Sequence, residues 1–335
     1  MSEVLVHVTR GNSIENIHRG NIAVIDRSGK LIAKAGNPYQ ATFMRSCSKP
    51  MQASAVLESG AAEQFGLDDR EIAIMCASHY SEDFHVQAVL SILYKIGLDE
   101  SYLKCGPTYS INEKVTEDYL RKGHTKKSTF NNCSGKHAGM LALALKCGYD
   151  VRTYNLLENP VQQRMLKTVA EYAEVDAEDI GLGIDGCGVP VYELPLFNIA
   201  LAYSKLADTG LLRGKRRAAA NKIISSMTRY PEMISGTGGF CTELMKHTNG
   251  KLVAKLGADA VYCVGAIGKG IGIAVKIEDG NMKVLSSAVV EVLRQLQLLD
   301  DDELKALWQF HIKDNINTLG DKVGEVRPAF TLAFQ

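Results

Sequence analysis

The chain has 335 residues, 46% of them apolar, which is enough for one large globular domain or two moderate ones. Its 38 Lys and Arg residues balance 38 Asp and Glu residues, so its overall charge favours neither nucleic acid nor an anionic membrane as a partner. No apolar run reaches the roughly 20 residues of a membrane-spanning helix, and the N-terminal segment lacks the apolar core of a secretory signal. We therefore expect a cytoplasmic protein with a small neutral or zwitterionic partner, whose eight cysteines are thiols or metal ligands rather than disulfides.

Apolar periodicity predicts strands at the N-terminus and helices directly after them. The expected strands are residues 4–8, 21–26 and 30–34. The expected helices are residues 46–60, 68–77 and a third that begins after residue 81. Four more helices are expected in the middle of the chain, at residues 135–146, 161–172, 194–206 and 216–227.

Strand-like patterns return near the C-terminus. They cover residues 252–256, 260–266, 271–277 and 282–285, and a helix is expected over residues 286–298. Strands at both ends with helices between them predict an α+β protein, with an antiparallel sheet built from both termini and a helical middle region. We expect a single catalytic unit over residues 1–335, with a sheet-containing part at about 1–60 and 250–335 and a mainly helical part at about 61–249.

Ser46 and Lys49 stand three residues apart at the start of the first expected helix, where both side chains can face the same way. A lysine amine that burial or a neighbouring cation keeps neutral can take the proton of a serine hydroxyl and make it a nucleophile. Pro50 is tolerated only in the first helical turn, which places Ser46 near a helix N-terminus, where backbone N–H groups favour negative charge. A helix cap followed by a solvated lysine would explain the same spacing, and Ser48 is a competing hydroxyl that we rank below Ser46.

Two further motifs follow in an informative order. Ser78 lies on an expected loop, and Lys255-Leu256-Gly257 lies on an expected late strand. Serine β-lactamases and penicillin-binding proteins use this order, with Ser-x-x-Lys first, a second serine next and Lys-x-Gly last. Each piece alone is more often structural, but together they indicate a serine hydrolase.

Five segments carry a more specific resemblance over nearly the whole chain. They are Arg45-Ser-Cys-Ser-Lys-Pro-Met-Gln-Ala53, Cys76-Ala-Ser-His79, Asn131-Asn-Cys-Ser-Gly-Lys-His-Ala-Gly-Met140, Gly183-Ile-Asp-Gly-Cys-Gly188 and Lys255-Leu-Gly-Ala258. The chain resembles the class 3, rhizobial-type L-asparaginases of the asparaginase II family, which share a serine β-lactamase/glutaminase-like fold. By this resemblance, Ser46 with Lys49 and Ser78 with Lys255 form two catalytic serine-lysine pairs that line one site.

Cysteines in two of these segments suggest a metal site. Judged by residue type alone, the tetrahedral set would be Cys133, His137 and Cys187, because thiolate and imidazole are the usual zinc ligands. The resemblance instead implies Zn²⁺ bound by Cys133, Lys136, Cys187 and a water molecule. Neutralising a lysine from a pKa of about 10.4 to 7 costs about 4–5 kcal/mol, against about 10–16 kcal/mol that structural zinc returns. Buried free cysteines beside a surface lysine are the structural alternative.

Three residues next to these motifs are candidate substrate-binding residues. Arg45 would help to hold the neighbouring nucleophile, Asp185 is a candidate for the α-amino group of the substrate, and His137 would contact the substrate or support the metal ligands. The metal would position the substrate rather than activate water, because the serines already supply a nucleophile.

The expected reaction is hydrolysis of L-asparagine to L-aspartate and ammonia through an acyl-enzyme on Ser46, with Lys49 as base and Ser78 and Lys255 as a proton relay. Which of Ser46 and Ser78 forms the covalent bond stays open. Glutamine, a β-lactam or a D-amino-acid peptide are alternative substrates on the same fold, and a noncatalytic zinc- or amino-acid-binding protein is the alternative from another class. The resemblance also implies a homodimer.

Overall fold

The structure is a computed structural model that describes all 335 residues, and it divides into two compact units. The sheet unit comprises Met1–Cys47, Leu194–Asp208 and Glu243–Gln335, and the helical unit comprises Ser48–Glu193 and Thr209–Thr242. Neither unit is a continuous stretch of chain, because the chain passes from one to the other four times. No helix is long and apolar enough to cross a membrane.

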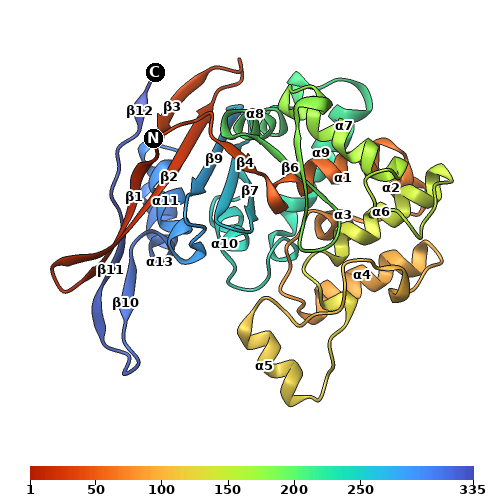
Figure 1. The fold of residues 1–335 in the computed structure, drawn as a ribbon, viewed down its shortest axis with the longest axis horizontal. Helices are drawn as coiled ribbons and strands as arrows, with labels where there is room; N and C mark the ends of the chain where they lie inside the picture. Colours follow the sequence, from red (N-terminus) through yellow and green to blue (C-terminus); the bar gives the residue numbers. More distant parts are fainter. The chain divides into compact units, whose positions relative to one another are not determined.

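Nine antiparallel strands form one curled sheet in the sheet unit (Figure 1). Its main path runs β10-β11-β1-β2-β9-β8-β7, and β3 pairs with both β2 and β12. The strands are β1 Glu3–Arg10, β2 Ser13–Ile25, β3 Leu31–Ala35, β7 Leu252–Gly257, β8 Val261–Ala266, β9 Ile271–Ile277, β10 Lys313–Ile316, β11 Lys322–Pro328 and β12 Ala333–Phe334. The first strand, β1, lies beside the late strand β11, so the prediction of an antiparallel sheet built from both termini is confirmed.

Helices α8 (Leu196–Ala207) and α11 (Met282–Gln295) pack on this sheet. Every residue of β8 is buried, so both faces of the sheet are covered at this strand. Gly272 in β9 permits the closest approach, since a Cβ there would lie 1.9 Å from the carbonyl oxygen of Ala200 in α8. The remaining elements of this unit are β4 Ala41–Phe43, α12 Asp301–Ala306 and α13 Trp308–His311.

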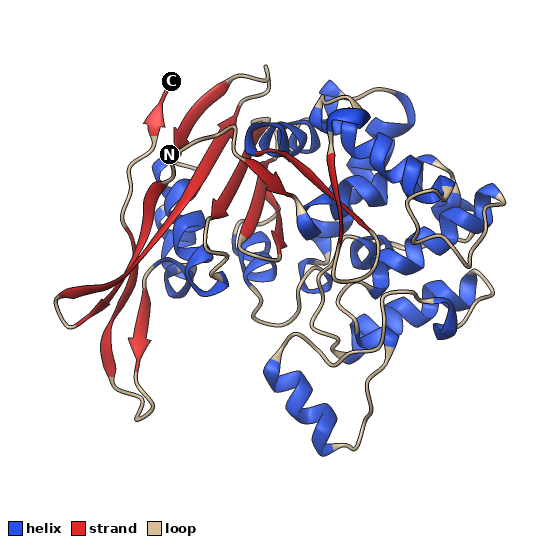
Figure 2. Ribbon diagram, in the orientation of Figure 1, coloured by secondary structure: helices blue, strands red, loops and turns tan.

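The helical unit is built mainly of helices (Figure 2). They are α1 Lys49–Glu58, α2 Ala61–Gln64, α3 Asp69–Met75, α4 Asp83–Lys95, α5 Glu113–Arg121, α6 Ser134–Cys147, α7 Pro160–Ala173 and α9 Gly214–Arg229. The short strands β5 (Gly181–Ile184) and β6 (Pro190–Pro195) form an antiparallel hairpin. Helix α10 (Phe240–His247) begins in this unit, and its residues from Glu243 belong to the sheet unit. Residues 134–144 of α6 are all buried, and α1 packs against α6, α7 and α9, so α1 and α6 form the centre of this unit.

Short 3-10 turns complete the chain. They are η1 Arg45–Ser48, η2 Glu100–Tyr102, η3 Ser128–Phe130, η4 Ala177–Asp179, η5 Thr209–Leu211 and η6 Pro231–Met233. The first matters for function, because the helix that was expected to begin near Ser46 begins only at Lys49, and Ser46 lies in η1. Ser48, rather than Ser46, is the residue that precedes the helix, with Pro50 in its first turn as expected.

One predicted strand is wrong. Residues 282–285 are the first turn of α11, which continues to Gln295. The side chain of Asn281 accepts a hydrogen bond from the backbone N–H of Lys283 and caps the helix, so the cap prevails over the strand-like alternation of these four residues. The division of the chain also differs from the expected ranges, since α8 belongs to the sheet unit and α1 to the helical unit.

Candidate active site and metal centre

In the sheet unit, the turn η1 presents Ser46 from a strained backbone. Arg45 has a φ of 48°, in the left-handed region that non-glycine residues rarely adopt. Ser46 itself is 8% exposed. The Cys47 thiol donates to the carbonyl oxygen of Lys255 at 3.1 Å, and the Tyr203 hydroxyl donates to the Cys47 carbonyl oxygen at 2.8 Å. The turn is therefore tied both to β7 and to α8.

The predicted Lys-x-Gly motif lies at the end of β7, as expected. Lys255 is fully buried, and its Nζ donates to the carbonyl oxygen of Leu256 at 2.6 Å. Gly257 is needed for packing, because a Cβ there would lie 2.4 Å from a methyl group of Val261 and 3.0 Å from the carbonyl oxygen of Met44. The strand thus lies directly against the residues that lead into η1.

In the helical unit, Lys49 and Ser78 form a buried pair. Lys49 Nζ lies 3.1 Å from Ser78 Oγ, and Lys49 is fully buried while Ser78 is 7% exposed. The same amine donates to the carbonyl oxygen of Ala77 and to that of Asn132, the latter at 3.3 Å. Three acceptors therefore surround the amine. The sequence motif suggested Ser46 as the hydrogen-bond partner of Lys49. Within this unit, the serine hydroxyl that accepts a hydrogen bond from Lys49 is that of Ser78.

The loop that carries Ser78 is fixed by His79. The backbone N–H of Ser81 donates to His79 Nδ1 at 3.1 Å, so Nε2 carries the proton and donates to Ser134 Oγ at 2.9 Å. Burial, followed by the charges of His85 and Lys49, lowers the pKa of His79 well below its ordinary value. A neutral histidine in a fixed tautomer thus connects the Ser78 loop to the start of α6.

The predicted metal ligands come together in the helical unit, with one addition. The ligand atoms of Cys133, Asp185 and Cys187 all lie within 4.8 Å of one another. Lys136 Nζ lies 3.1 Å from Cys187 Sγ and 3.8 Å from Asp185 Oδ2. Two thiols, an amine and a carboxylate in such proximity are suitable donors for zinc. The residues therefore fit the metal, and Asp185, which was expected to bind the substrate, lies within reach of the same centre.

Neighbouring groups in this cluster shift one another's pKa values. A hydrogen bond with Cys133 lowers the pKa of Cys187 to about 6, against the effect of burial, whereas that bond and burial raise the pKa of Cys133 to about 12. Burial acts to lower the pKa of Lys136, but Cys187, Cys133 and Asp185 outweigh it and raise that pKa above its ordinary value. Cys187 is therefore the more acidic thiol of the two, and its neighbours favour the charged form of Lys136.

His137 is not part of this cluster. Its Nδ1 lies 2.7 Å from the hydroxyl of Tyr154, and burial followed by the charge of Lys136 lowers the pKa of His137 to about 3. Its Nε2 is buried without a hydrogen-bond partner. The set of Cys133, His137 and Cys187 suggested by residue type is therefore not the set that the structure groups together.

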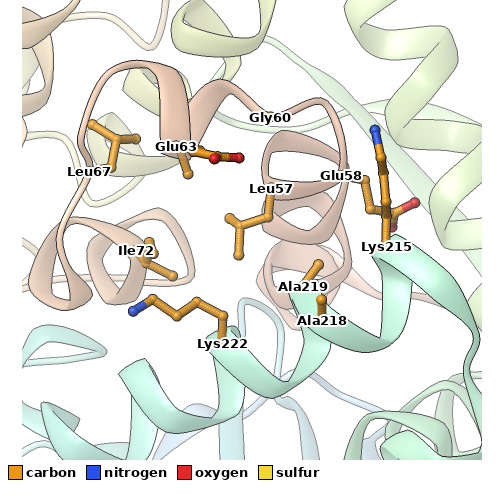
Figure 3. Close-up of a pocket in the computed structure, with 11 residues that line it drawn as sticks. Leu57, Glu58, Gly60, Glu63, Leu67, Ile72, Lys215, Ala218, Ala219 and Lys222 are labelled. Carbon is orange, nitrogen blue, oxygen red and sulfur yellow. The ribbon is translucent and has the colours of Figure 1, made fainter.

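A separate cavity of about 370 Å³ opens beside the C-terminal end of α1 and contains none of the predicted site residues. Figure 3 shows Leu57 at its centre, with Lys215 and Lys222 both extending from α9. Ile72 adds to its apolar wall. Since it holds neither serine-lysine pair nor thiol, this cavity does not provide the chemistry expected of the chain.

Comparison with known protein families identifies the class of protein to which this arrangement belongs. A family described as L-asparaginase II matches residues 6–328, nearly the whole chain. The chain therefore belongs to the L-asparaginase II family. No curated protein matches it.

Among solved structures, the chain is similar to crystal structures of Mglu. Mglu in its native form is 15% identical, with a TM-score of 0.40, and the match covers 85% of this chain and 66% of that chain. Mglu in its L-glutamate binding form, in the presence of 4.3M NaCl, is 17% identical, with a TM-score of 0.39 and coverage of 85% and 62%. The chain thus spans slightly less than two thirds of the length of these proteins.

Proposed function

We propose that the protein is an amidohydrolase that converts L-asparagine to L-aspartate and ammonia through an acyl-enzyme. Membership of the L-asparaginase II family supports the type of reaction. The observation that carries the mechanism is the buried amine of Lys49 at 3.1 Å from the hydroxyl of Ser78. An antiparallel sheet covered by helices α8 and α11 within its own unit is also in keeping with a serine β-lactamase/glutaminase-like fold.

In the proposed reaction, Ser46 Oγ attacks the side-chain amide carbon of asparagine, and the amine of Lys49 acts as the base that accepts the hydroxyl proton. The Cα atoms of Ser46 and Lys49 are three residues apart and therefore at most about 11 Å from each other. The C–N bond then breaks, and the proton passes from Lys49 through the Ser78 hydroxyl to the leaving nitrogen, so that ammonia departs. Water attacks the acyl-enzyme with the same amine as base, which releases aspartate and restores Ser46. Lys255 would support the relay at Ser78.

Backbone N–H groups at the start of α1 are suitable donors for the oxyanion of the intermediate. The side chain of Ser48 makes no capping hydrogen bond there, so no side-chain cap uses these donors. In addition, the positive end of the helix dipole favours the negative charge that develops on the carbonyl oxygen.

We also propose that Cys133, Lys136 and Cys187 hold Zn²⁺, with a water molecule as the fourth ligand. When bound, the ion would supply a positive charge that orients the polar groups of the substrate. Asp185 would bind the α-amino group of asparagine or support the ligands, since its carboxylate lies 3.4 Å from Cys187 Sγ. His137 would contribute a polar contact from beside the centre.

Ammonia release from asparagine and glutamine, measured side by side with and without a chelator, tests reaction, substrate and metal together. We expect asparagine to be preferred, and Ser46→Ala to lower its turnover about ten-thousand-fold while the fold is retained. Ser48→Ala is the matched control and should keep most of the activity. Near-normal turnover in Ser46→Ala would refute the assignment of Ser46 as the nucleophile. If only Ser78→Ala lost its turnover, Ser78 would be the nucleophile and Ser46 part of the relay. A homodimer is proposed on the resemblance alone, and sedimentation equilibrium tests this oligomeric state.

A further inference from the structure

Three of the seven non-glycine residues with left-handed backbone lie in two segments of the sheet unit that one ion pair joins. Arg45 begins η1 with a φ of 48°. Asp259 and Ala260, with φ values of 55° and 56°, lie in the loop between β7 and β8. The guanidinium of Arg45 pairs with the carboxylate of Asp259. Strained conformations of this kind persist only where surrounding contacts determine them, and they gather at functional sites.

The strained loop is held from its other side by β9 and α11. Lys276 in β9 donates to the carbonyl oxygen of Asp259, and the Ile277 N–H donates to that of Ala260 at 3.0 Å. The Ala260 N–H in turn lies 3.0 Å from the sulfur of Met282. Together with the ion pair to Arg45, four contacts therefore fix this loop. Glycines at positions 259 and 260 would adopt the same backbone without strain.

The same two segments carry Ser46 and Lys255. Lys255 lies four residues before Asp259, on β7, and Ser46 directly follows Arg45. The Cys47 thiol donates to the Lys255 carbonyl oxygen at 3.1 Å, so this hydrogen bond connects η1 to β7 and the ion pair connects it to the loop that follows β7. A rigid connection at two points sets how the hydroxyl of Ser46 is presented.

We infer that Asp259 is a positioning residue that acts through Arg45 to hold Ser46 in its reactive orientation. The inference rests on the proposed role of Ser46 as nucleophile. The side chain of Asp259 is 68% exposed and that of Arg45 is 23% exposed, so the pair adds little to global stability. Its effect falls on the orientation of the turn, where a displacement of about 1 Å can lower a rate about a hundredfold.

The test compares Asp259→Asn with Asp314→Asn, which removes a similarly exposed carboxylate paired with Lys322 at 2.7 Å in the same unit. We expect Asp259→Asn to lower kcat about tenfold or more, with KM changed less than about twofold and the melting temperature close to that of Asp314→Asn. Asp259→Glu should restore a large part of kcat, because it keeps the carboxylate. Ala260→Gly should keep the wild-type kcat, because it removes strain from the loop but leaves the ion pair.

Amide hydrogen exchange of residues 44–48 gives a second measurement that does not depend on turnover. Asp259→Asn should speed exchange of the Cys47 N–H, which donates to the Met44 carbonyl oxygen, and Asp314→Asn should not. If kcat and exchange in Asp259→Asn both match those of Asp314→Asn, the inference is overturned. It is also overturned if exchange rises throughout both units, since the effect is then on global stability. If the wild-type protein hydrolyses no amide, the proposed function fails, and exchange at Cys47 alone decides whether Asp259 holds the turn.

Discussion

Lys49 in the helical unit and Lys255 in the sheet unit are both fully buried, but their surroundings differ in kind. The amine of Lys49 is surrounded by two loop carbonyl oxygens and the Ser78 hydroxyl, and it lies close enough to Cys133 and Cys187 to affect their charge. Lys255 belongs to a regular antiparallel ladder in which it pairs with Cys263.

The helical unit thus surrounds one amine with several polar groups, whereas the sheet unit fixes the backbone of η1 through separate contacts to β7, α8 and the loop between β7 and β8. A substitution in the first kind of site leaves a buried polar group without its partner. A substitution in the second removes one contact of η1 and mainly shifts the turn, because the other contacts still hold it. The predictions below test this contrast.

The largest effect is expected from Lys49→Met. It should lower asparagine turnover about ten-thousand-fold and also destabilise the protein, because the carbonyl oxygens of Ala77 and Asn132 lose a buried donor at about 1–3 kcal/mol each. Lys255→Met should lower turnover with a smaller loss in the free energy of unfolding, because the pairing of β7 with β8 does not depend on its side chain. Urea unfolding and ammonia release measure both, and a larger destabilisation by Lys255→Met would reverse the contrast.

Zinc uptake should release about two protons per site near pH 7.5, one from Cys133 and one from Lys136, and its affinity should rise with pH. Cys187, with a pKa of about 6, is already ionised at that pH and contributes little. Calorimetry in buffers with different ionisation enthalpies counts the protons. In Lys136→Ala the number should fall to about one, and release of only one proton by the wild-type protein would favour Asp185 over Lys136 as the third ligand.

Tyr203→Phe should cost about 1–2 kcal/mol of unfolding free energy, because the Cys47 carbonyl oxygen loses its hydrogen bond within the core. Turnover should fall less than in Lys49→Met, since Ser46 stays tied to β7 through the Cys47 thiol. Equilibrium unfolding and ammonia release on the same preparation measure the two effects. A loss of turnover as large as that of Lys49→Met would mean that the sheet unit is as sensitive as the helical unit.

The smallest effect is expected far along the chain in the sheet unit, at Glu291. Burial acts to raise the pKa of this carboxyl group, but hydrogen bonds with Arg294, His311 and Gln295 outweigh it and lower the pKa to about 2. A carboxyl group with a lowered pKa contributes stability that is present above its unfolded value of about 4.5 and is lost as the pH falls toward 2. Glu291→Gln should therefore flatten the pH dependence of unfolding between pH 4.5 and 2, and an unchanged slope would count against this ion cluster.

Periodicity predicted most of the fold, because helices such as α6 and α7 have long apolar stripes and clear starts, for example Asn159-Pro160. It failed where a local cap decided the outcome, as at residues 282–285. It also gave no sign that α8 would belong to the sheet unit, because the packing partner of a helix depends on tertiary contacts.

The candidate site was predicted in part. Motif order singled out Ser78 and Lys255 as candidates, but the hydrogen bond from Lys49 to Ser78 joins residues 29 apart, and spacing along the chain does not reveal such a contact. The Asp-x-Cys spacing of Asp185 and Cys187 could have suggested a third ligand near the thiols. Asp259 is a residue type that tolerates left-handed backbone, but nothing in the sequence signals it at Ala260, where glycine, asparagine or aspartate would be the usual sign.

The pairing of β1 with β11 has a consequence for synthesis of the protein. Val6 pairs with Pro328, so one hydrogen-bonding edge of the first strand stays open until almost the whole chain has left the ribosome. The helical unit, by contrast, has all its residues once Thr242 has emerged. During that interval the exposed edge can pair with another nascent chain. A truncated protein that ends before Lys322 lacks β11, and it should therefore aggregate instead of folding into a less active enzyme.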